Sequence, residues 1–332
     1  MMAKRYAVLG GGGSFGIHTS KYLLEQPDTE RVLGIGRAAP KPEPFTLNVG
    51  KGDKRYSYHA YHVTHELDLL MELLDREKPN IVVCYAAQGE GAASWKNWWR
   101  YFETNAMGLA RLAETLSKRD YLERFIQIGT SELYGSVETA TPEDAPIRSS
   151  SPYSASKAAF DLCLIAVHQN LGFPMNVIRP SNAYCPGQLL HRVIPKAVVF
   201  GLTGRKVPLH GGGKAEKSYI HARDVARAVY LVAERAPLGA VYNVGPPEPI
   251  SIRRLLETVA KVMNLPFEDL VEVTGERLGQ DSRYWLDSSA IKRDVGWEPQ
   301  ISLEEGIQDM VDWAEKYLDD LKDWPTDFTM RA

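Results

Sequence analysis

The chain has little cysteine, little net charge and no long apolar run, and each of these limits what it can be. Its 332 residues include only three cysteines, Cys84, Cys163 and Cys185, whose spacing matches no metal site. A sparse and odd cysteine count is typical of a reducing compartment. The net charge of −3 gives no sign of a nucleic-acid partner or an anionic membrane surface. No apolar run approaches the roughly 18 residues of a membrane-spanning helix.

A strand-like run at residues 6–9 follows the first methionine almost at once and leaves no room for a signal peptide. We therefore expect a cytoplasmic protein without a metal site, a nucleic-acid partner or a membrane anchor. Hydrophobic residues make up 44% of the chain, which is enough for a sizeable core, and the length favours about two domains or one large one.

A glycine-rich segment near the N-terminus indicates a dinucleotide site. The strand-like run leads into residues 10–16, which read GGGGSFG, and a helix is predicted from there to about residue 25. Strand, glycine turn and helix bind a pyrophosphate, because the glycines let backbone N–H groups approach it at the helix N-terminus. Ser14 and Phe15 begin that helix. The segment fits two glycine registers, Gly10, Gly13 and Gly16 or Gly11, Gly13 and Gly16.

The end of the second predicted strand bears on the choice of cofactor. Residues 32–36 form this strand, and Arg37 follows. An acidic residue at this point binds the 2′-hydroxyl of an adenosine ribose, whereas an arginine accommodates a 2′-phosphate. The sequence therefore favours NADP over NAD, unless Arg37 is only a solvated loop residue.

The segment from residue 124 to 171 carries the catalytic candidates. Residues 124–128 form a short apolar run typical of a buried parallel strand, and Thr130, Ser131 and Glu132 follow it. Ser151 is typical of a helix cap and Pro152 of a first helical residue, so we expect a helix from Pro152 to about residue 171. Gly172 ends this helix.

Tyr153 and Lys157 share one face near the start of that helix, because they are four residues apart. Tyrosine has an ordinary pKa of about 10 and is a poor base at neutral pH. A neighbouring ammonium and the helix N-terminus both favour the phenolate and are expected to lower that pKa. A phenolate at this place can take a proton from a sugar hydroxyl while a hydride leaves the same carbon. A chance pair on a surface helix is the alternative.

Together these segments resemble the extended short-chain dehydrogenase/reductase family, and within it the nucleotide-sugar 4,6-dehydratases with their epimerase and decarboxylase relatives. The resemblance covers nearly the whole chain. It implies an α/β fold, a doubly wound parallel Rossmann sheet with a small discontinuous substrate-binding lobe. Residues 1–180, 219–245 and 295–320 would form the dinucleotide-binding domain, and residues 181–218 and 246–294 the nucleotide-sugar-binding lobe.

The resemblance also assigns cofactor residues. It favours the register with Gly10, and it places Ala86 and Ala87, at the end of a strand predicted over residues 81–87, beside the cofactor. Asn105 would support the hydrogen bonds of the active site. Relatives often carry an aspartate near the adenine where this chain has His62. The segment around Arg37 resembles GDP-mannose 4,6-dehydratases, which use NADP.

The same resemblance implies a nucleotide-diphosphate sugar as substrate. The residues expected to bind it are Gln88, Asn182, Lys217, Arg277, Gln280 and Asp281. Asn182 and Arg277 would hold phosphates, and Gln280 or Asp281 would face the ribose. Lys217 stands where relatives carry an arginine, so it brings a charge without the paired donors of a guanidinium.

Three reactions remain open. In each, Tyr153 takes the O4 proton, Thr130 hydrogen-bonds that hydroxyl, and C4 loses a hydride. A 4,6-dehydratase also needs a base near C5, and Glu132 is placed for it. Many dehydratases carry an aspartate, as the acid, where this chain has Ser131, and a serine is far too weak an acid to replace it. We rank dehydratase first, 4-epimerase second and UDP-glucuronate-type decarboxylase third.

Two further expectations concern binding. A protein of this fold that only senses NADP is the non-enzymatic alternative, but such proteins usually lack the tyrosine or lysine that this chain keeps. The family resemblance implies a homodimer in which helices over residues 100–117 and 153–171 form a four-helix bundle. Phe160, Leu164 and Val167 suit either the core or that interface. The aromatic residues at 95–102 suit the core or an interface better than a ligand site.

Overall fold

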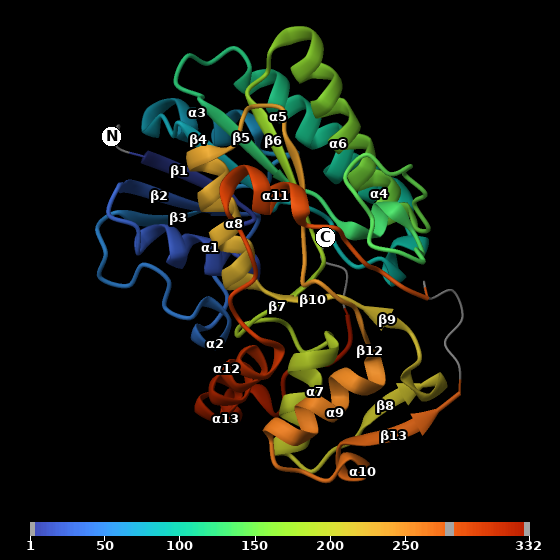
Figure 1. Ribbon diagram of the computed structural model, residues 1–332. Coiled ribbons are helices and arrows are strands. Elements are labelled where there is room, and N and C mark those ends of the chain that lie inside the picture. The colour runs from blue at the N-terminus through green and yellow to red at the C-terminus, as the bar shows by residue number, and fades with distance from the viewer. Residues whose placement is uncertain (1–3, 276–281, 329–332) are drawn as a thin grey trace.

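The computed structural model describes residues 4–275 and 282–328. Three predicted substrate residues, Arg277, Gln280 and Asp281, lie outside the described residues. Figure 1 shows a sheet with helices in the upper part of the molecule and a smaller lobe below it. No helix in the described part of the chain is long and apolar enough to cross a bilayer.

Seven parallel strands form the main sheet. Their order is β3-β2-β1-β4-β5-β6-β11. The strands are β1 (Lys4–Leu9), β2 (Thr29–Gly36), β3 (Tyr56–Ala60), β4 (Ile81–Cys84), β5 (Arg124–Ile128), β6 (Met175–Pro180) and β11 (Val241–Val244). The order reverses between β1 and β4, and in such sheets ligands bind at the carboxyl ends of the strands beside this reversal. The loops after β1, β4 and β5 therefore face one another.

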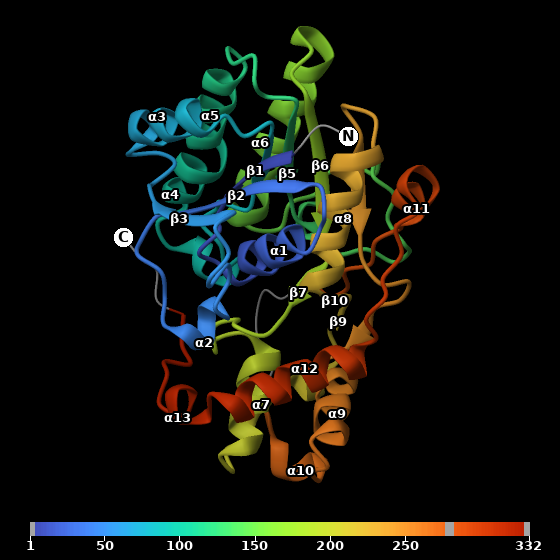
Figure 2. The ribbon, with the colours of Figure 1, turned by 90° about the vertical axis from the view of Figure 1, so that its left-hand side faces the viewer.

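Helices cover both faces of the sheet. One face packs on α1 (Ser14–Leu24), α8 (Ala222–Arg235) and α11 (Ser289–Val295), and the other on α3 (Leu67–Glu77), α5 (Leu109–Leu116) and α6 (Pro152–Leu171). Figure 2 shows the two groups on opposite sides of the strands. Strands buried on both faces read as continuous apolar runs, as in β4. The predicted doubly wound α/β fold with a small lobe is confirmed.

The lobe has a core of its own. It contains α7 (Val193–Leu202), α9 (Ile252–Val262), α10 (Phe267–Leu270), α12 (Leu303–Lys316) and α13 (Leu318–Leu321). Two small sheets complete it, β8 (Val207–His210) with β13 (Val271–Thr274) and β9 (Glu216–Lys217) with β12 (Ile250–Ser251). A third pair, β7 (Asn182–Tyr184) and β10 (Tyr219–His221), lies between lobe and main sheet.

Two helices near the C-terminus pack differently from the predicted division of the chain. Helix α12 was predicted with the dinucleotide-binding domain, but it packs on α7 and α9 and buries Ile307 and Met310 in the lobe core. Helix α11 was predicted with the lobe, but it packs on α8 and β11 and buries Ile291 in the core of the main sheet. Sequence order does not reveal which of two apolar cores a late helix joins.

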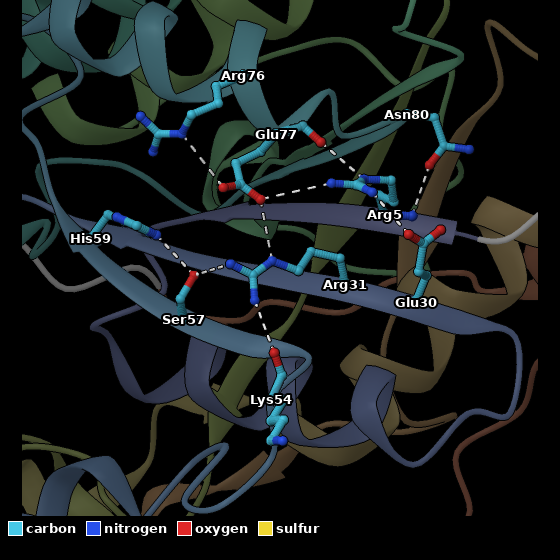
Figure 3. A network of polar contacts seen from close by, with 9 residues as sticks. All are labelled: Arg5, Glu30, Arg31, Lys54, Ser57, His59, Arg76, Glu77 and Asn80. Atoms are coloured by element: carbon cyan, nitrogen blue, oxygen red, sulfur yellow. Dashed lines mark hydrogen bonds and ion pairs between the residues drawn. The ribbon is translucent and has the colours of Figure 1, made fainter.

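A network of charged side chains ties the amino-terminal half of the sheet together, away from the ligand edge (Figure 3). The Glu77 carboxylate, at the end of α3, lies 3.3 Å from Arg31 of β2 and 3.7 Å from Arg5 of β1. Arg31 also donates to the Ser57 hydroxyl of β3 at 2.9 Å, and the Arg5 N–H donates to Asn80 at 2.9 Å. These contacts hold neighbouring strands in register and leave the opposite edge to the ligand loops.

Several predicted elements match the structure closely. Strand β5 has the predicted bounds, and α6 starts after Ser151, whose hydroxyl accepts from the Ser154 N–H at 3.2 Å in a capping box. Gly172 ends α6 with φ 71°, a left-handed conformation that glycine adopts without strain. Residues 38–58, which are rich in proline, glycine and lysine, contain α2 (Glu43–Thr46) and the start of β3.

The helix predicted over residues 100–117 is not continuous. A helical turn, α4 (Trp98–Phe102), leads into a π-helical segment, η2 (Glu103–Gly108), and only then into α5. Asn105 lies within that segment and is fully buried. The wider turn delivers its side chain into the molecule, which is a common use of π-helical segments at functional sites.

The structure assigns the apolar residues of α6 that were predicted for either the core or the dimer interface. Phe160 and Leu164 are 1% exposed and belong to the core, and Val167 packs against it. Leu162, on the outer side of α6, is 51% exposed. The tryptophans at 95, 98 and 99 are 58–65% exposed, so a place in the core is wrong for them, whereas Tyr101 is buried.

Replacement of Phe160 by alanine is expected to lower the free energy of unfolding by about 3–5 kcal/mol, because it leaves a cavity beneath α6. Leu171→Ala, at an 80% exposed leucine at the end of the same helix, is the control and is expected to change it by no more than about 0.5 kcal/mol. Urea unfolding followed by circular dichroism measures both. Equal losses in the two variants would contradict the assignment of Phe160 to the core.

Candidate active site

The glycine loop after β1 has the close approaches that a dinucleotide cradle needs. Gly10 has φ 82°, and a Cβ there would lie 2.8 Å from the Tyr85 carbonyl carbon. A Cβ at Gly16 would lie 2.9 Å from the Gly11 Cα, so the first turn of α1 packs directly on the loop. Gly13 is the N-cap of α1 and brings no side chain over the first N–H groups. These groups are left to bind an anion, which fits a pyrophosphate.

A cavity of about 390 Å³ runs along the carboxyl edge of the sheet from this loop. Gly10 and Gly13 line it, as the preferred register requires, and Ala86, Ala87 and Gln88 line it beyond β4. Ser14 and Phe15, also predicted for the cofactor, are half-buried at the start of α1 and do not line the cavity. The cavity therefore joins the two segments that the sequence assigned to the cofactor.

One end of the cavity carries two cationic side chains and a histidine. Arg37, Lys41 and His62 line it, and the Lys41 ammonium donates to the Gly12 carbonyl at 2.6 Å. The Tyr58 hydroxyl donates to the Ala38 carbonyl at 2.7 Å and holds the loop that carries these groups. The residue after β2 is Arg37, so β2 ends without the carboxylate that binds a ribose 2′-hydroxyl.

Three catalytic candidates lie close together, between the end of β5 and the start of α6. Thr130 follows β5, and its hydroxyl accepts from the Glu132 N–H at 3.2 Å. Tyr153 lies in the first turn of α6. A Cβ at Gly91 would lie 3.0 Å from the Glu132 carboxylate and 3.9 Å from the Tyr153 ring, so both side chains contact the same loop. The arrangement brings a hydroxyl, a carboxylate and a phenol together.

The prediction that Lys157 lowers the pKa of Tyr153 is not what the side chains show. Burial raises the pKa of Tyr153 and the Glu132 charge raises it further, whereas the hydrogen bond from Thr130 and the Arg192 charge lower it. The Lys157 ammonium is itself buried and donates to the Ile128 carbonyl at 2.6 Å. Burial lowers the pKa of Lys157, and the Asp161 carboxylate opposes this.

A buried polar network lies behind Lys157. Asp161, one turn further along α6, lies 3.1 Å from Arg179 of β6 in an ion pair that is almost wholly buried. Arg179 also donates to the Tyr134 hydroxyl at 2.8 Å, and Tyr134 donates to Asn243 of β11 at 3.0 Å. The network joins α6 to β6, β11 and the turn after β5, which fixes the backbone that carries Thr130 and Tyr153.

Asn105 connects the cofactor loop to the catalytic helix, as its expected supporting role requires. Its side-chain oxygen accepts from the Gln88 N–H at 2.7 Å, and its amide donates to the Gln88 carbonyl at 3.0 Å and to the Ser156 hydroxyl at 2.9 Å. Gln88, predicted to bind substrate, is only 6% exposed and accepts from Arg37 at 3.4 Å within the cavity.

The remaining predicted residues are more scattered. Asn182 lies in β7, half-buried, where its N–H donates to the Ser218 carbonyl at 3.0 Å. Lys217 is 5% exposed, and its ammonium lies 3.4 Å from the centre of the Tyr284 ring. Ser131 is 2% exposed in the turn after β5. Neither Asn182 nor Lys217 lines the large cavity.

Sequence reasoning missed two groups at the cavity. The first consists of Glu90, which follows the predicted cofactor residues, and of His191 and Arg192, which follow β7. The Nε2 atom of His191 and a guanidinium nitrogen of Arg192 each lie 3.1 Å from the Glu90 carboxylate. The second is the segment 324–328, where Trp324 and Phe328 line the cavity. Glu90 stands two residues after Gln88 and could have been found there, but no local pattern marks the C-terminal segment.

Comparison with known proteins identifies the class. Residues 6–245 match the family described as the NAD dependent epimerase/dehydratase family. This match covers more than half of the chain, and the chain therefore belongs to this family of enzymes. The resemblance drawn from the glycine loop, Thr130, Tyr153 and Lys157 is confirmed.

Particular relatives agree with the family. The chain is 29% identical over 327 residues to a dTDP-glucose 4,6-dehydratase of Haemophilus influenzae, with 92% of this chain and 96% of the relative covered. It is 26% identical over 314 residues to a trifunctional UDP-glucose 4,6-dehydratase/UDP-4-keto-6-deoxy-D-glucose 3,5-epimerase/UDP-4-keto-L-rhamnose-reductase of Arabidopsis thaliana. That alignment covers 93% of this chain but 47% of the relative, so the chain spans about half the length of such proteins.

A solved structure supports the same fold. The dTDP-glucose 4,6-dehydratase of Bacillus anthracis in complex with NAD superposes with a TM-score of 0.86 at 26% identity, over 96% of this chain and 98% of that one. The fold is therefore that of the NAD dependent epimerase/dehydratase family.

Proposed function

We propose that the protein is a nucleotide-sugar 4,6-dehydratase. The observation that carries this proposal is the carboxylate of Glu132 beside Tyr153: a Cβ at Gly91 would lie 3.0 Å from the carboxylate and 3.9 Å from the Tyr153 ring. A 4-epimerase needs a base for O4 and no base for C5, whereas a dehydratase needs both. The 4,6-dehydratases among the similar proteins support the choice.

The side chains suggest a division of labour. Tyr153 takes the proton from O4 while Thr130 hydrogen-bonds that hydroxyl and holds it in place. Gly10, Gly13, Ala86 and Ala87 would hold a nicotinamide dinucleotide, which would supply the hydride acceptor for C4 and a positive charge that favours the phenolate. Glu132 then takes the proton from C5, which is acidic beside a 4-keto group, and the C6 hydroxyl leaves as water. Glu132 returns a proton to C5 at the end of the cycle.

A 4-epimerase is the second candidate, and Ser131 is the observation that favours it. Many dehydratases have an aspartic acid at this position to protonate the leaving hydroxyl, and the serine here is both buried and too weak an acid. An epimerase loses no hydroxyl and needs no such acid. The two reactions are separated by what happens at C5.

Glu132→Gln is expected to lower the rate of elimination by about 10²–10⁴-fold, because it keeps the shape of the side chain and removes the base. UDP-, GDP-, CDP- and dTDP-hexoses form the substrate panel, in D2O. The wild type is expected to give a 4-keto-6-deoxy sugar with deuterium at C5. The variant is expected to accumulate reduced nicotinamide, because oxidation at C4 persists.

Glu138→Gln is the control, a surface carboxylate in the same part of the chain that is 92% exposed. It is expected to turn over at the wild-type rate. Product formation without deuterium at C5, or a Glu132→Gln variant as fast as the wild type, would contradict the dehydratase proposal and favour a 4-epimerase.

We also propose that NADP is preferred over NAD within this NAD-dependent family. Arg37, Lys41 and His62 at one end of the cavity support the proposal, together with the missing carboxylate after β2. A 2′-phosphate carries up to two negative charges, which a guanidinium binds with paired donors.

Arg37→Ala is expected to weaken NADP binding by about tenfold or more and to change NAD binding little, because only NADP has the phosphate. Isothermal titration calorimetry of both cofactors measures the ratio of dissociation constants. Arg76→Ala, a 65% exposed arginine on α3 far from the cavity, is the control. A wild type that binds NAD more tightly, or an unchanged ratio in Arg37→Ala, would show that Arg37 does not select the cofactor.

The protein is further proposed to form a homodimer through α4, α5 and α6. Large apolar side chains are exposed on these elements and the turns beside them, namely Trp95, Trp98, Trp99, Met107 and Leu162. A monomer seldom exposes so many large apolar groups on neighbouring elements without covering them.

Light scattering at micromolar concentration is expected to give about twice the 37.1 kDa mass of the chain. Leu162→Glu is expected to shift the protein toward the monomer, because it places a charge in the middle of the α6 contact. Leu238→Glu, at a 43% exposed leucine after α8, is the control and is expected to stay dimeric. A monomeric wild type refutes the four-helix bundle.

A further inference from the structure

Glu90 has an unusual backbone in the loop after β4. It is not glycine, yet its φ is 79°. Such a conformation is strained for an L-residue and persists only where the surroundings hold it, often at functional sites. The Tyr101 hydroxyl donates to the Glu90 carbonyl at 3.3 Å, which helps to fix the peptide in this position.

The Glu90 side chain bridges from the main sheet to the lobe. Its carboxylate lies 3.1 Å from the Nε2 atom of His191 and 3.1 Å from a guanidinium nitrogen of Arg192. Both partners come from the segment between β7 and α7, about a hundred residues further along the chain. Glu90 and His191 are 19% and 13% exposed, so the cluster is largely shielded from solvent.

This cluster lies beside the catalytic side chains. Tyr101, which holds Glu90, packs edge-on against the Tyr153 ring with 6.5 Å between ring centres. The residue after Glu90 is Gly91, where a Cβ would lie 3.0 Å from the Glu132 carboxylate and 3.9 Å from the Tyr153 ring. After burial and Glu132, the charges that act on the pKa of Tyr153 include Arg192, which lowers it, and Glu90, which raises it.

His191 also reaches the cavity itself. It lines the cavity together with Ala87 and Gln88. Its ring packs edge-on against Phe328, with 5.2 Å between ring centres. With Nε2 directed to Glu90, the other ring nitrogen, Nδ1, is left to meet a ligand.

The residues assigned to the proposed reaction do not include an acid for the leaving hydroxyl. Departure of the C6 hydroxyl requires a proton, and neither Ser131 nor Arg192 can supply it, because a serine is too weak an acid and a guanidinium does not lose its proton in proteins. Glu132 is engaged in removing the C5 proton. Histidine is the side chain best suited to donate a proton near neutral pH, and a carboxylate on one ring nitrogen orients it and stabilises the imidazolium.

We propose that His191, oriented by Glu90, is the acid that protonates the departing C6 hydroxyl, in place of the aspartic acid that Ser131 replaces. His191 is then a catalytic residue and Glu90 a positioning residue. The inference rests on the proposed dehydratase function.

The protons of the cycle balance. The C5–H bond breaks with its proton on Glu132, the C5–C6 double bond forms, and the C6–O bond breaks as oxygen takes the His191 proton and leaves as water. The hydride removed from C4 is returned to C6, and Glu132 returns its proton to C5. Tyr153 has gained the O4 proton, which restores the one lost by His191, so the cycle consumes no external acid.

The test compares two leaving groups in His191→Asn, where the amide keeps a polar side chain but cannot act as the acid. One substrate is the nucleotide hexose that the wild type turns over, and the other is its 6-deoxy-6-fluoro analogue, whose fluoride leaves without a proton. The variant is expected to lose about 10²–10⁴-fold with the 6-hydroxyl substrate and less than tenfold with the 6-fluoro analogue. Deuterium exchange at C5 and oxidation at C4 are expected to persist.

Glu90→Gln is the second variant, and it keeps the test decisive if His191→Asn does not fold. It is expected to show a smaller loss with the same dependence on the leaving group, which a merely structural role would not produce. His210→Asn is the control, a histidine of β8 in the lobe, and is expected to match the wild type with both substrates.

Equal losses with both leaving groups, or a variant that remains as fast as the wild type, would overturn the role of His191. A wild type that forms no 4-keto-6-deoxy sugar from any substrate in the panel would overturn the dehydratase proposal, and this inference with it. The two failures are distinguishable because the first appears only in the variants and the second already in the wild type.

Discussion

The buried ammonium of Lys157 is the constraint on which the arrangement of the site depends. A charge that is 2% exposed is tolerated only when it is paired and hydrogen-bonded. The ammonium donates a hydrogen bond to the Ile128 carbonyl at 2.6 Å. Asp161 supplies a negative charge nearby, and Arg179 forms an ion pair with Asp161. These partners come from β5, α6 and β6, so the three elements can meet in only one way. This arrangement fixes the positions of Thr130 and Tyr153.

The same requirement extends to the lobe. The Glu90 carboxylate lies 3.1 Å from His191 and from Arg192, which both precede α7 of the lobe, and Asn105 fixes the loop through the backbone of Gln88. The lobe therefore closes on the sheet through charged contacts placed next to the reacting groups. A substrate that enters between them meets a site whose polar groups are already oriented, which is the condition for electrostatic stabilisation of a transition state.

Local patterns were sufficient for much of the fold. The strand over residues 124–128 and the helix from Pro152 to Leu171 were predicted with their bounds, because an apolar run, a serine cap, a proline and a terminal glycine act within a few residues of one another. The glycine loop was found for the same reason. The family could be recognised from Thr130, Tyr153 and Lys157, since their spacing reflects one strand end and one helix turn.

The sequence by itself determined the sheet, the cofactor loop and the catalytic helix, because each is fixed by short-range chemistry. Only the tertiary structure decided that Phe160 faces the core, that α12 joins the lobe, and that burial and Glu132 raise the pKa of Tyr153. It also brought Glu90 to His191 across about a hundred residues. Burial and long-range charge are properties of the packed chain, and no local pattern encodes which distant side chain will share a cavity.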